Sequence, residues 1–328
     1  MLRQRVITAS ILLAVVLLTL YLAPSWAWGL LSAVALWFAG REWERLILPA
    51  GVALRAAAPG AAAVQPPVQP PAQPPTEASS RTAGQTTGQT PASDGFPWLA
   101  TGLVAVALAC LGWRESAGAE VAPGWESGLL VVDLLLWLLL AVPAVFRARP
   151  FPFGARTFAA VSLFCLWLGL YELRRIDPTL LLSAMAVIWA ADVGAYFVGR
   201  AFGRRKLAPR VSPGKSWEGA LGGLAVVLLL AALAIAVLPD TGALSAVFPH
   251  WLAGRAGIGT ALWVLVAMVA LSIIGDLYES LLKRARGVKD SGRLFPGHGG
   301  MLDRIDALVP TMPLALFVVQ AVFQRSGG

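Results

Sequence analysis

The chain is predicted to be an all-α integral membrane protein, a polytopic bundle of about nine transmembrane helices with a cytoplasmic N-terminus. Of its 328 residues, 57% are hydrophobic and only 13% are charged, and the mean hydropathy is +0.70. Soluble domains usually carry about a quarter charged residues, so an ordinary soluble protein is excluded. Cys110 and Cys165 both lie in apolar segments, which indicates neither a disulfide framework nor a thiolate metal cluster.

A helix needs about 20 mostly apolar residues to cross a bilayer. Nine segments approach or reach this length, although the second and fifth are short. They are residues 6–22, 26–38, 97–113, 128–146, 158–170, 180–197, 220–238, 261–282 and 307–323.

The Lys and Arg residues predict the orientation of these helices, because cytoplasmic loops carry an excess of positive charge. With the N-terminus in the cytoplasm, 21 of the 26 Lys and Arg residues fall on the cytoplasmic side. The same orientation places both strongly basic segments of the C-terminal half there. Because no known nucleic-acid-binding fold is evident, we expect the net charge of +8 to serve topology and anionic ligands rather than nucleic acid.

The most polar stretch of the C-terminal half, residues 280–306, lies between the last two apolar segments and reads SLLKRARGVKDSGRLFPGHGGMLDRID. Ionisable groups near lipid are costly and tend to mark functional sites. Acidic residues at helical spacing lie on both sides of its basic, Gly-rich centre: Asp276 and Glu279 before it, Asp303 and Asp306 after it. This pattern suits a metal-dependent reaction on phosphates, because carboxylates hold Mg²⁺ while cations neutralise phosphate charge.

A second basic segment, residues 192–223, reads DVGAYFVGRAFGRRKLAPRVSPGKSWEGALGG. Asp192 lies deep in an apolar run, and an intramembrane carboxylate indicates a functional group. Six cations follow, from Arg200 to Lys215. Membrane topology alone explains some of this charge, but not the Gly- and Pro-rich spacing around it.

Both segments resemble the phosphatidate cytidylyltransferases, also called CDP-diacylglycerol synthases. In the later segment the matching positions are Ser280, Lys283-Arg284, Lys289-Asp290, Gly292, Phe295-Pro296, His298-Gly299-Gly300, Asp303-Arg304 and Asp306. In the earlier segment they are Asp192, Ala195-Tyr196, Gly199, Gly203, Lys206-Leu207, Pro209, Ser212-Pro213, Lys215 and Trp217-Glu218-Gly219, with Ser216 where the family has Thr. The N-terminal half resembles the family only in hydropathy.

The resemblance implies a nucleotidyltransferase of phospholipid biosynthesis that transfers the cytidylyl group of CTP to phosphatidic acid, giving CDP-diacylglycerol and pyrophosphate. The expected cofactor is Mg²⁺, with Mn²⁺ as an alternative and a second cation left open. The expected partners are CTP, phosphatidic acid and membrane lipids, and a homodimer is left open. We expect a multi-pass protein of the cell (inner) membrane with its active site facing the cytoplasm.

The residue chemistry and the resemblance together predict the site. Asp276 and Asp303 are the predicted metal ligands. The predicted catalytic residues are Asp276, Asp303, Lys283, Lys289, Asp290 and His298. The predicted substrate-binding residues are Asp192, Tyr196, Lys206, Ser212, Lys215, Ser216, Glu218, Glu279, Ser280, Arg284, Gly299, Gly300, Arg304 and Asp306. For His298, a hydrogen bond to phosphate and protonation of the leaving pyrophosphate both stay open, as does completion of the metal shell by Asp290 or Asp306.

We expect four parts along the chain. They are an N-terminal transmembrane hairpin (1–50), a Pro/Gln/Ala-rich disordered cytoplasmic linker (51–96), middle transmembrane helices (97–178) and a catalytic transmembrane region with two basic loops (179–328). The sequence Arg41-Glu42-Trp43-Glu44-Arg45 ends the second predicted span. We interpret it as a solvated helix end with an interfacial Trp, the alternative being a functional acidic residue.

A membrane transporter or channel for an anionic solute is the alternative function. Numerous spans, an intramembrane Asp192 and basic loops fit it in outline. It predicts inverted repeats and broken helices, neither of which is evident, and it gives Asp276 and Asp303 no role.

Overall fold

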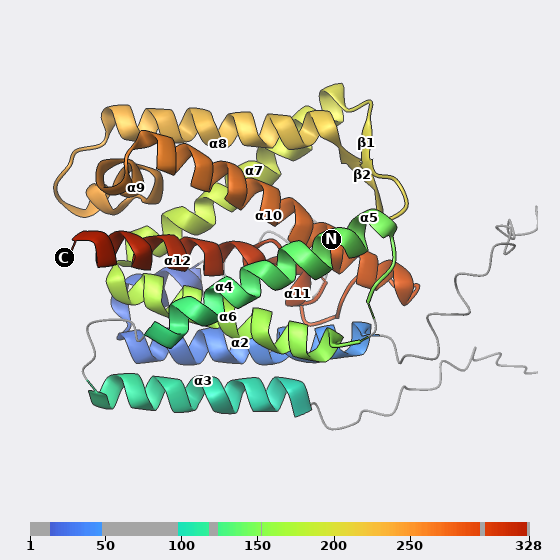
Figure 1. Ribbon diagram of the computed structural model, residues 1–328, viewed down its shortest axis with the longest axis horizontal. Coiled ribbons are helices and arrows are strands. Elements are labelled where there is room, and N and C mark those ends of the chain that lie inside the picture. Colours follow the sequence, from blue (N-terminus) through green and yellow to red (C-terminus); the bar gives the residue numbers. More distant parts are fainter. Residues whose placement is uncertain (1–13, 48–97, 118–123, 152, 296–298, 327–328) are drawn as a thin grey trace, which may run out of the picture.

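The computed structural model describes residues 14–47, 98–117, 124–151, 153–295 and 299–326, which form a bundle of long helices (Figure 1). Residues 14–22 are helical. The helices that follow are α2 (Ser25–Leu46), α3 (Trp98–Ala117), α4 (Gly124–Leu136), α5 (Val142–Arg147), α6 (Ala155–Ile176), α7 (Pro178–Phe202), α8 (Trp217–Val237), α9 (Phe248–Ala256), α10 (Ile258–Ala285), α11 (Leu302–Ile305) and α12 (Leu308–Ser326). A five-residue π-helical segment, Trp137–Ala141, joins α4 to α5, so that 124–147 runs as one continuous helix.

Within the described residues, six helices are long and apolar enough to cross a membrane. They are Gly124–Arg147, Ala155–Ile176, Pro178–Phe202, Trp217–Val237, Ile258–Ala285 and Leu308–Arg325. Each overlaps one of the predicted spans, and α3 contains a shorter apolar stretch, Ala100–Arg114. The prediction of a helical membrane bundle is therefore confirmed. The first predicted span, 6–22, begins outside the described residues, and the predicted linker 51–96 lies wholly outside them. The total of nine spans stays a prediction.

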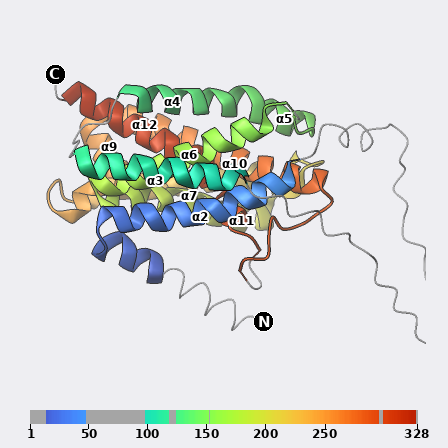
Figure 2. The same cartoon turned by 90° about the horizontal axis from the view of Figure 1, so that it is seen from below.

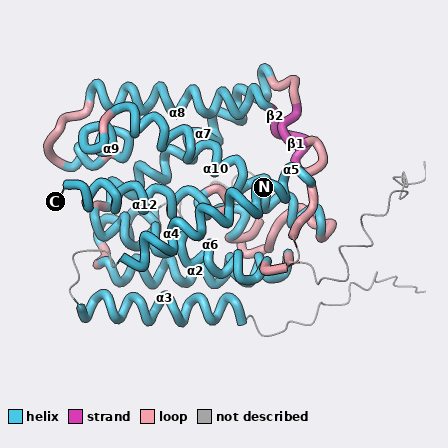
Figure 3. The backbone as a smooth tube through the Cα atoms, viewed as in Figure 1, coloured by secondary structure: helices cyan, strands magenta, loops and turns pink. Residues whose placement is uncertain are grey.

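The two basic segments lie at the same end of the bundle. In Figures 1 and 2, α5 and the C-terminal end of α10 lie at one end, and α9 and the C-terminus lie at the other. The basic segment after α7 folds as a small antiparallel hairpin, β1 (Lys206–Ala208) and β2 (Ser212–Ser216), at the first of these ends (Figure 3). The all-α prediction therefore holds for the bundle but not for this loop.

Helices α7 and α8 pack closely because small residues line their contact. A Cβ atom added at Gly223 would lie 2.4 Å from the backbone oxygen of Ala191, so only glycine allows this approach. At the start of α8 the backbone N–H of Gly219 donates to Ser216 Oγ at 3.2 Å, which caps the helix. The hairpin and α8 are thus held against the end of α7, where the candidate site lies.

A buried ion cluster joins four helices at the end of the bundle opposite to the hairpin. One guanidinium nitrogen of Arg114, on α3, lies 2.9 Å from Glu126 Oε1 on α4 and 2.6 Å from Glu172 Oε1 on α6. Gln320, on α12, donates to the second oxygen of Glu126 at 3.1 Å. All four side chains are buried. Arg114 follows directly after the predicted span 97–113, but the structure buries it inside the bundle, where it packs against two carboxylates.

Candidate active site

A cavity of about 560 Å³ opens among α7, the hairpin, α8 and α10. Its volume lies within the range of about 300–1,000 Å³ that is usual for ligand sites. Three ionisable side chains that were predicted as site residues line it: Asp192, Lys215 and Asp276. Ser212, Ser216 and Tyr196 add hydroxyl groups, and apolar residues such as Val269 and Ile273 line the α10 side. The cavity therefore combines charged and apolar surfaces, as a site for a charged group attached to a lipid requires.

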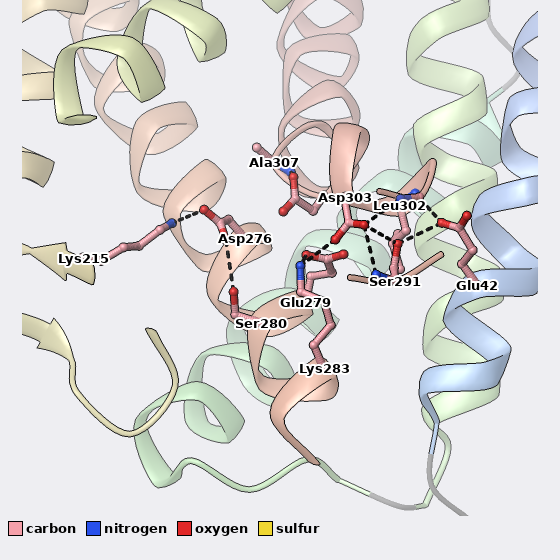
Figure 4. Close-up of polar contacts among 12 residues, drawn as sticks. Glu42, Lys215, Asp276, Glu279, Ser280, Lys283, Ser291, Leu302, Asp303 and Ala307 are labelled. Carbon is pink, nitrogen blue, oxygen red and sulfur yellow. Dashed lines mark hydrogen bonds and ion pairs between the residues drawn. The ribbon is translucent and has the colours of Figure 1, made fainter. Parts of the chain in front are cut away.

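Asp276 links the two basic segments directly. Its Oδ2 lies 2.5 Å from the ammonium nitrogen of Lys215 on β2, and its Oδ1 accepts a hydrogen bond of 3.3 Å from Ser280 one turn further along α10 (Figure 4). Both charged side chains of the ion pair remain partly exposed to the cavity, at 26% for Lys215 and 33% for Asp276. The pair can therefore meet a ligand without first being uncovered.

A second polar cluster lies beside this ion pair, around Lys283. The Lys283 ammonium donates to Glu279, one turn before it on α10, and to Asp303 Oδ1 at 2.7 Å (Figure 4). The other oxygen of Asp303 accepts from the backbone N–H of Gly300 at 2.8 Å and from both the N–H and the hydroxyl of Ser291 at 3.0 Å. Burial alone would raise the pKa of Asp303, but the hydrogen bonds from Lys283 and Gly300 outweigh it and lower that pKa to about 2. Asp303 is therefore ionised at neutral pH.

Comparison with known proteins identifies the family. Residues 89–322 match the model of the cytidylyltransferase family. The chain belongs to this family.

Three curated phosphatidate cytidylyltransferases illustrate the likeness. The chain is 53% identical to the one from Haemophilus influenzae over 134 residues, which cover 41% of this chain and 43% of that protein. It is 37% identical to the one from Pseudomonas aeruginosa over 211 residues, covering 58% of this chain and 69% of the relative. The relative from Bacillus subtilis is 37% identical over 199 residues, covering 57% and 67%.

The cytidylyltransferase fold gathers most of the predicted site residues into two groups. The cavity group comprises Asp192, Tyr196, Ser212, Lys215, Ser216 and Asp276, with Ser280 hydrogen-bonded to Asp276. The Lys283 group comprises Glu279, Lys283, Gly300 and Asp303. Asp306 lines a small pocket with Gly275 and Glu279 of α10, and burial together with the charge of Asp276 raises the pKa of its carboxyl group.

Other predicted residues lie outside these groups. The side chains of Lys206, Arg284, Lys289, Asp290 and Arg304 are exposed. Glu218 accepts from the backbone N–H groups of Arg204 and Arg205, at 3.1 Å for the shortest contact with each, and so holds the hairpin to α8 instead of lining the cavity. Gly299 instead borders the Lys283 group: its φ of 85° favours glycine, and a Cβ added there would lie 2.6 Å from Asp303 Oδ2. His298 lies outside the described residues, and its two possible roles stay predictions.

The carboxylates of this cytidylyltransferase fit Mg²⁺ in their chemistry. In the described part of the chain, no three His, Cys, Asp or Glu side chains are grouped closely enough to hold a metal by themselves. Mg²⁺ usually keeps several waters and binds through one or two carboxylates together with substrate phosphates, so a partial protein shell suits it. Asp276 and Asp306 could supply two such carboxylates, because the charge of Asp276 raises the pKa of Asp306 and a bound cation would relieve this repulsion. Asp303 accepts three hydrogen bonds on Oδ2 but only the one from Lys283 on Oδ1, so Oδ1 is the oxygen with a lone pair left for a cation.

Two residues outside the predicted site hold it together: Ser291, and Glu42 near the end of α2, which the sequence offered only as the alternative of a functional acidic residue. Glu42 is only 5% exposed and Trp43 only 2%, so the interpretation of residues 41–45 as a solvated helix end with an interfacial Trp is wrong. Trp43 packs in an aromatic cluster with Phe158 and Tyr278. The only signal in the sequence was an acidic residue at the end of an apolar segment.

Proposed function

We propose that the chain transfers the cytidylyl group of CTP to phosphatidic acid, giving CDP-diacylglycerol and pyrophosphate. The observation that carries the proposal is the Lys215–Asp276 ion pair in the cavity. It joins the earlier segment that resembles phosphatidate cytidylyltransferases to α10, where Ser280, the first residue of the later segment, donates to Asp276. The curated relatives bear that name, and the match covers less than half of the Haemophilus influenzae protein but more than two thirds of several others. Membership of the family supports the same reaction class.

In the proposed reaction, a phosphate oxygen of phosphatidic acid attacks the α-phosphorus of CTP. A new P–O bond forms, the bond from the α-phosphorus to the oxygen that bridges to the β-phosphorus breaks, and that oxygen leaves with pyrophosphate. No protein nucleophile is needed, because the phosphate of phosphatidic acid is already anionic near neutral pH. The protein's task is to hold two polyanions in line and to neutralise their charge.

The cavity supplies the groups for this task. Lys215 lies where it can neutralise phosphate oxygens, and the hydroxyls of Ser212 and Tyr196 can donate hydrogen bonds to them. Asp276 orients the Lys215 ammonium in the absence of substrate. Mg²⁺ held by Asp276, with Asp303 and Asp306 as further carboxylates, would supply additional charge neutralisation at the α-phosphate and the leaving pyrophosphate.

We further propose that the chain lies in the cell (inner) membrane, with about nine spans and its N-terminus inside. The end of the bundle that carries the hairpin and the cavity would then face the cytoplasm, where CTP is found. Two observations support this orientation. The predicted cytoplasmic side carries 21 of the 26 Lys and Arg residues. Both basic segments lie at one end of the helical bundle (Figure 1).

The test is the fate of the phosphates of CTP. The purified chain in detergent would be given phosphatidic acid and Mg²⁺ with CTP radiolabelled at either the α- or the γ-phosphate. Cytidylyl transfer predicts that the α-label enters the lipid and the γ-label is released as pyrophosphate. A γ-label in the lipid would mean phosphoryl transfer, and no labelled lipid from a folded sample would contradict the proposed function.

A further inference from the structure

Glu42 holds the loop that carries Asp303. The carboxylate of Glu42 accepts three hydrogen bonds from residues about 250 positions later in the chain (Figure 4). Its Oε1 accepts from the backbone N–H of Met301 at 3.1 Å. Its Oε2 accepts from the N–H of Leu302 at 2.8 Å and from the hydroxyl of Ser291 at 2.9 Å. One carboxylate on α2 therefore fixes both arms of the loop.

These donors are all neutral, which is unusual for a buried carboxylate. Within the described residues no cation forms an ion pair with Glu42, and the neighbouring Arg41 guanidinium lies over the ring of Trp37 at 4.7 Å instead. A buried carboxylate is costly unless its hydrogen bonds are satisfied. The loop must therefore stay in place for Glu42 to remain buried, and Glu42 in turn restrains the loop.

The loop backbone also fits tightly around this carboxylate. A Cβ atom added at Gly292 would lie 2.2 Å from Glu42 Oε1, and one added at Gly300 would lie 2.3 Å from Glu42 Oε2. Real Cβ atoms do not approach an oxygen so closely. Both positions therefore require glycine as long as Glu42 occupies its present place.

Glu42 is connected to Asp303 through a shared partner. The Ser291 hydroxyl lies 2.9 Å from Glu42 Oε2 and 3.0 Å from Asp303 Oδ2. The N–H of Leu302, the residue before Asp303, donates to Glu42. On its other side Asp303 is held by Lys283 of α10. The position of Asp303 is thus set between α2 and α10.

We propose that Glu42 is a positioning residue of the active site, which acts through Ser291 and the 301–302 backbone to hold Asp303 beside Lys283. Glu42 lies outside the stretch that matches the family model, residues 89–322, so α2 adds a residue to the site from outside that stretch. The expected change in kcat rests on the proposed function. The expected change in the hydrogen–deuterium exchange of the loop does not.

The test compares Glu42→Gln with Glu44→Gln in the full-length chain. Glutamine keeps the size of the side chain but presents an NH₂ group to a donor of the loop, so one hydrogen bond is lost. Glu44 is two residues further along α2 and makes no hydrogen bond to the described part of the loop, so it is the matched control. If Glu42→Gln does not fold, Ser291→Ala removes the hydroxyl link alone.

Two readouts are needed. Hydrogen–deuterium exchange of peptides covering residues 289–303 should become faster in Glu42→Gln, with the rest of the bundle unchanged and with no effect of Glu44→Gln. The kcat for CDP-diacylglycerol formation should fall about 10- to 100-fold, as is typical when a residue that orients a metal ligand is lost, with little change in KM for phosphatidic acid.

The exchange result does not depend on the reaction, so it separates failure of this inference from failure of the proposed function. Unchanged exchange at 289–303 would overturn the inference. Faster exchange with a wild-type kcat, or faster exchange throughout the bundle, would also overturn it, because Glu42 would then be a purely structural residue.

Discussion

Lys215 on β2 and Asp276 on α10 form an ion pair of 2.5 Å at the wall of the cavity, although 60 residues and a full membrane-spanning helix separate them in sequence. The pair fixes the hairpin against α10. It also places one cation and one carboxylate where two anionic substrates would meet.

Replacing Lys215 by Met should lower kcat/KM for CTP at least about 100-fold, because the cavity loses a preorganised positive charge. Steady-state kinetics on the purified variant measures this. Arg210→Gln is the control, since Arg210 is an exposed cation at the turn of the same hairpin and does not line the cavity. Equal kinetics for the two variants would remove Lys215 from the site.

Replacing Gly300 by Ala should lower activity by about 10-fold or more, because the added Cβ would meet Glu42 and Ser291 at 2.3 Å and displace the loop that holds Asp303. The assay is kcat per folded molecule. Gly254→Ala is the matched control on α9, where a Cβ meets no atom within 4 Å. A fully active Gly300→Ala variant would show that the loop tolerates displacement.

Replacing Arg114 by Met should destabilise the protein by about 3 kcal/mol or more, because Glu126 and Glu172 would be left buried without their cation. The kcat of the folded fraction should not change, since the cluster lies at the end of the bundle away from the cavity. Denaturant unfolding in detergent measures the free energy of unfolding. Arg325→Met, an exposed position on α12, is the control, and equal stability of the two variants would contradict the assigned role.

Hydropathy and charge were sufficient to predict the helical bundle, because each apolar segment carries its own signal. The two basic segments were recognised from residue types and spacing, and the structure brings them together at one end. Lys215 and Asp276 both belonged to the predicted site, but their pairing across the cavity could not be predicted from local pattern. Tertiary contacts of this kind depend on how the helices pack.

The dependence of tertiary contacts on helix packing also explains why the roles of three residues could not be predicted. Glu42 looks like a solvated charge beside Arg41, and only the packing of α2 against the loop shows that it is buried and satisfied by backbone N–H groups. Arg114 looks like a loop cation, yet its partners come from α4 and α6. Glu218 lies within the matching segment but caps the hairpin, a role that depends on a β-structure the hydropathy pattern does not reveal.

The cavity between α7, the hairpin and α10 is the proposed active centre, and Asp276 is its proposed metal ligand. The most direct test is CDP-diacylglycerol formation from CTP and phosphatidic acid, with Mg²⁺, by purified wild-type protein and by Asp276→Asn, which keeps the side-chain shape. The account predicts product from the wild type, none after chelation of the metal, and none from a variant that remains folded. Near-normal turnover by Asp276→Asn would contradict it.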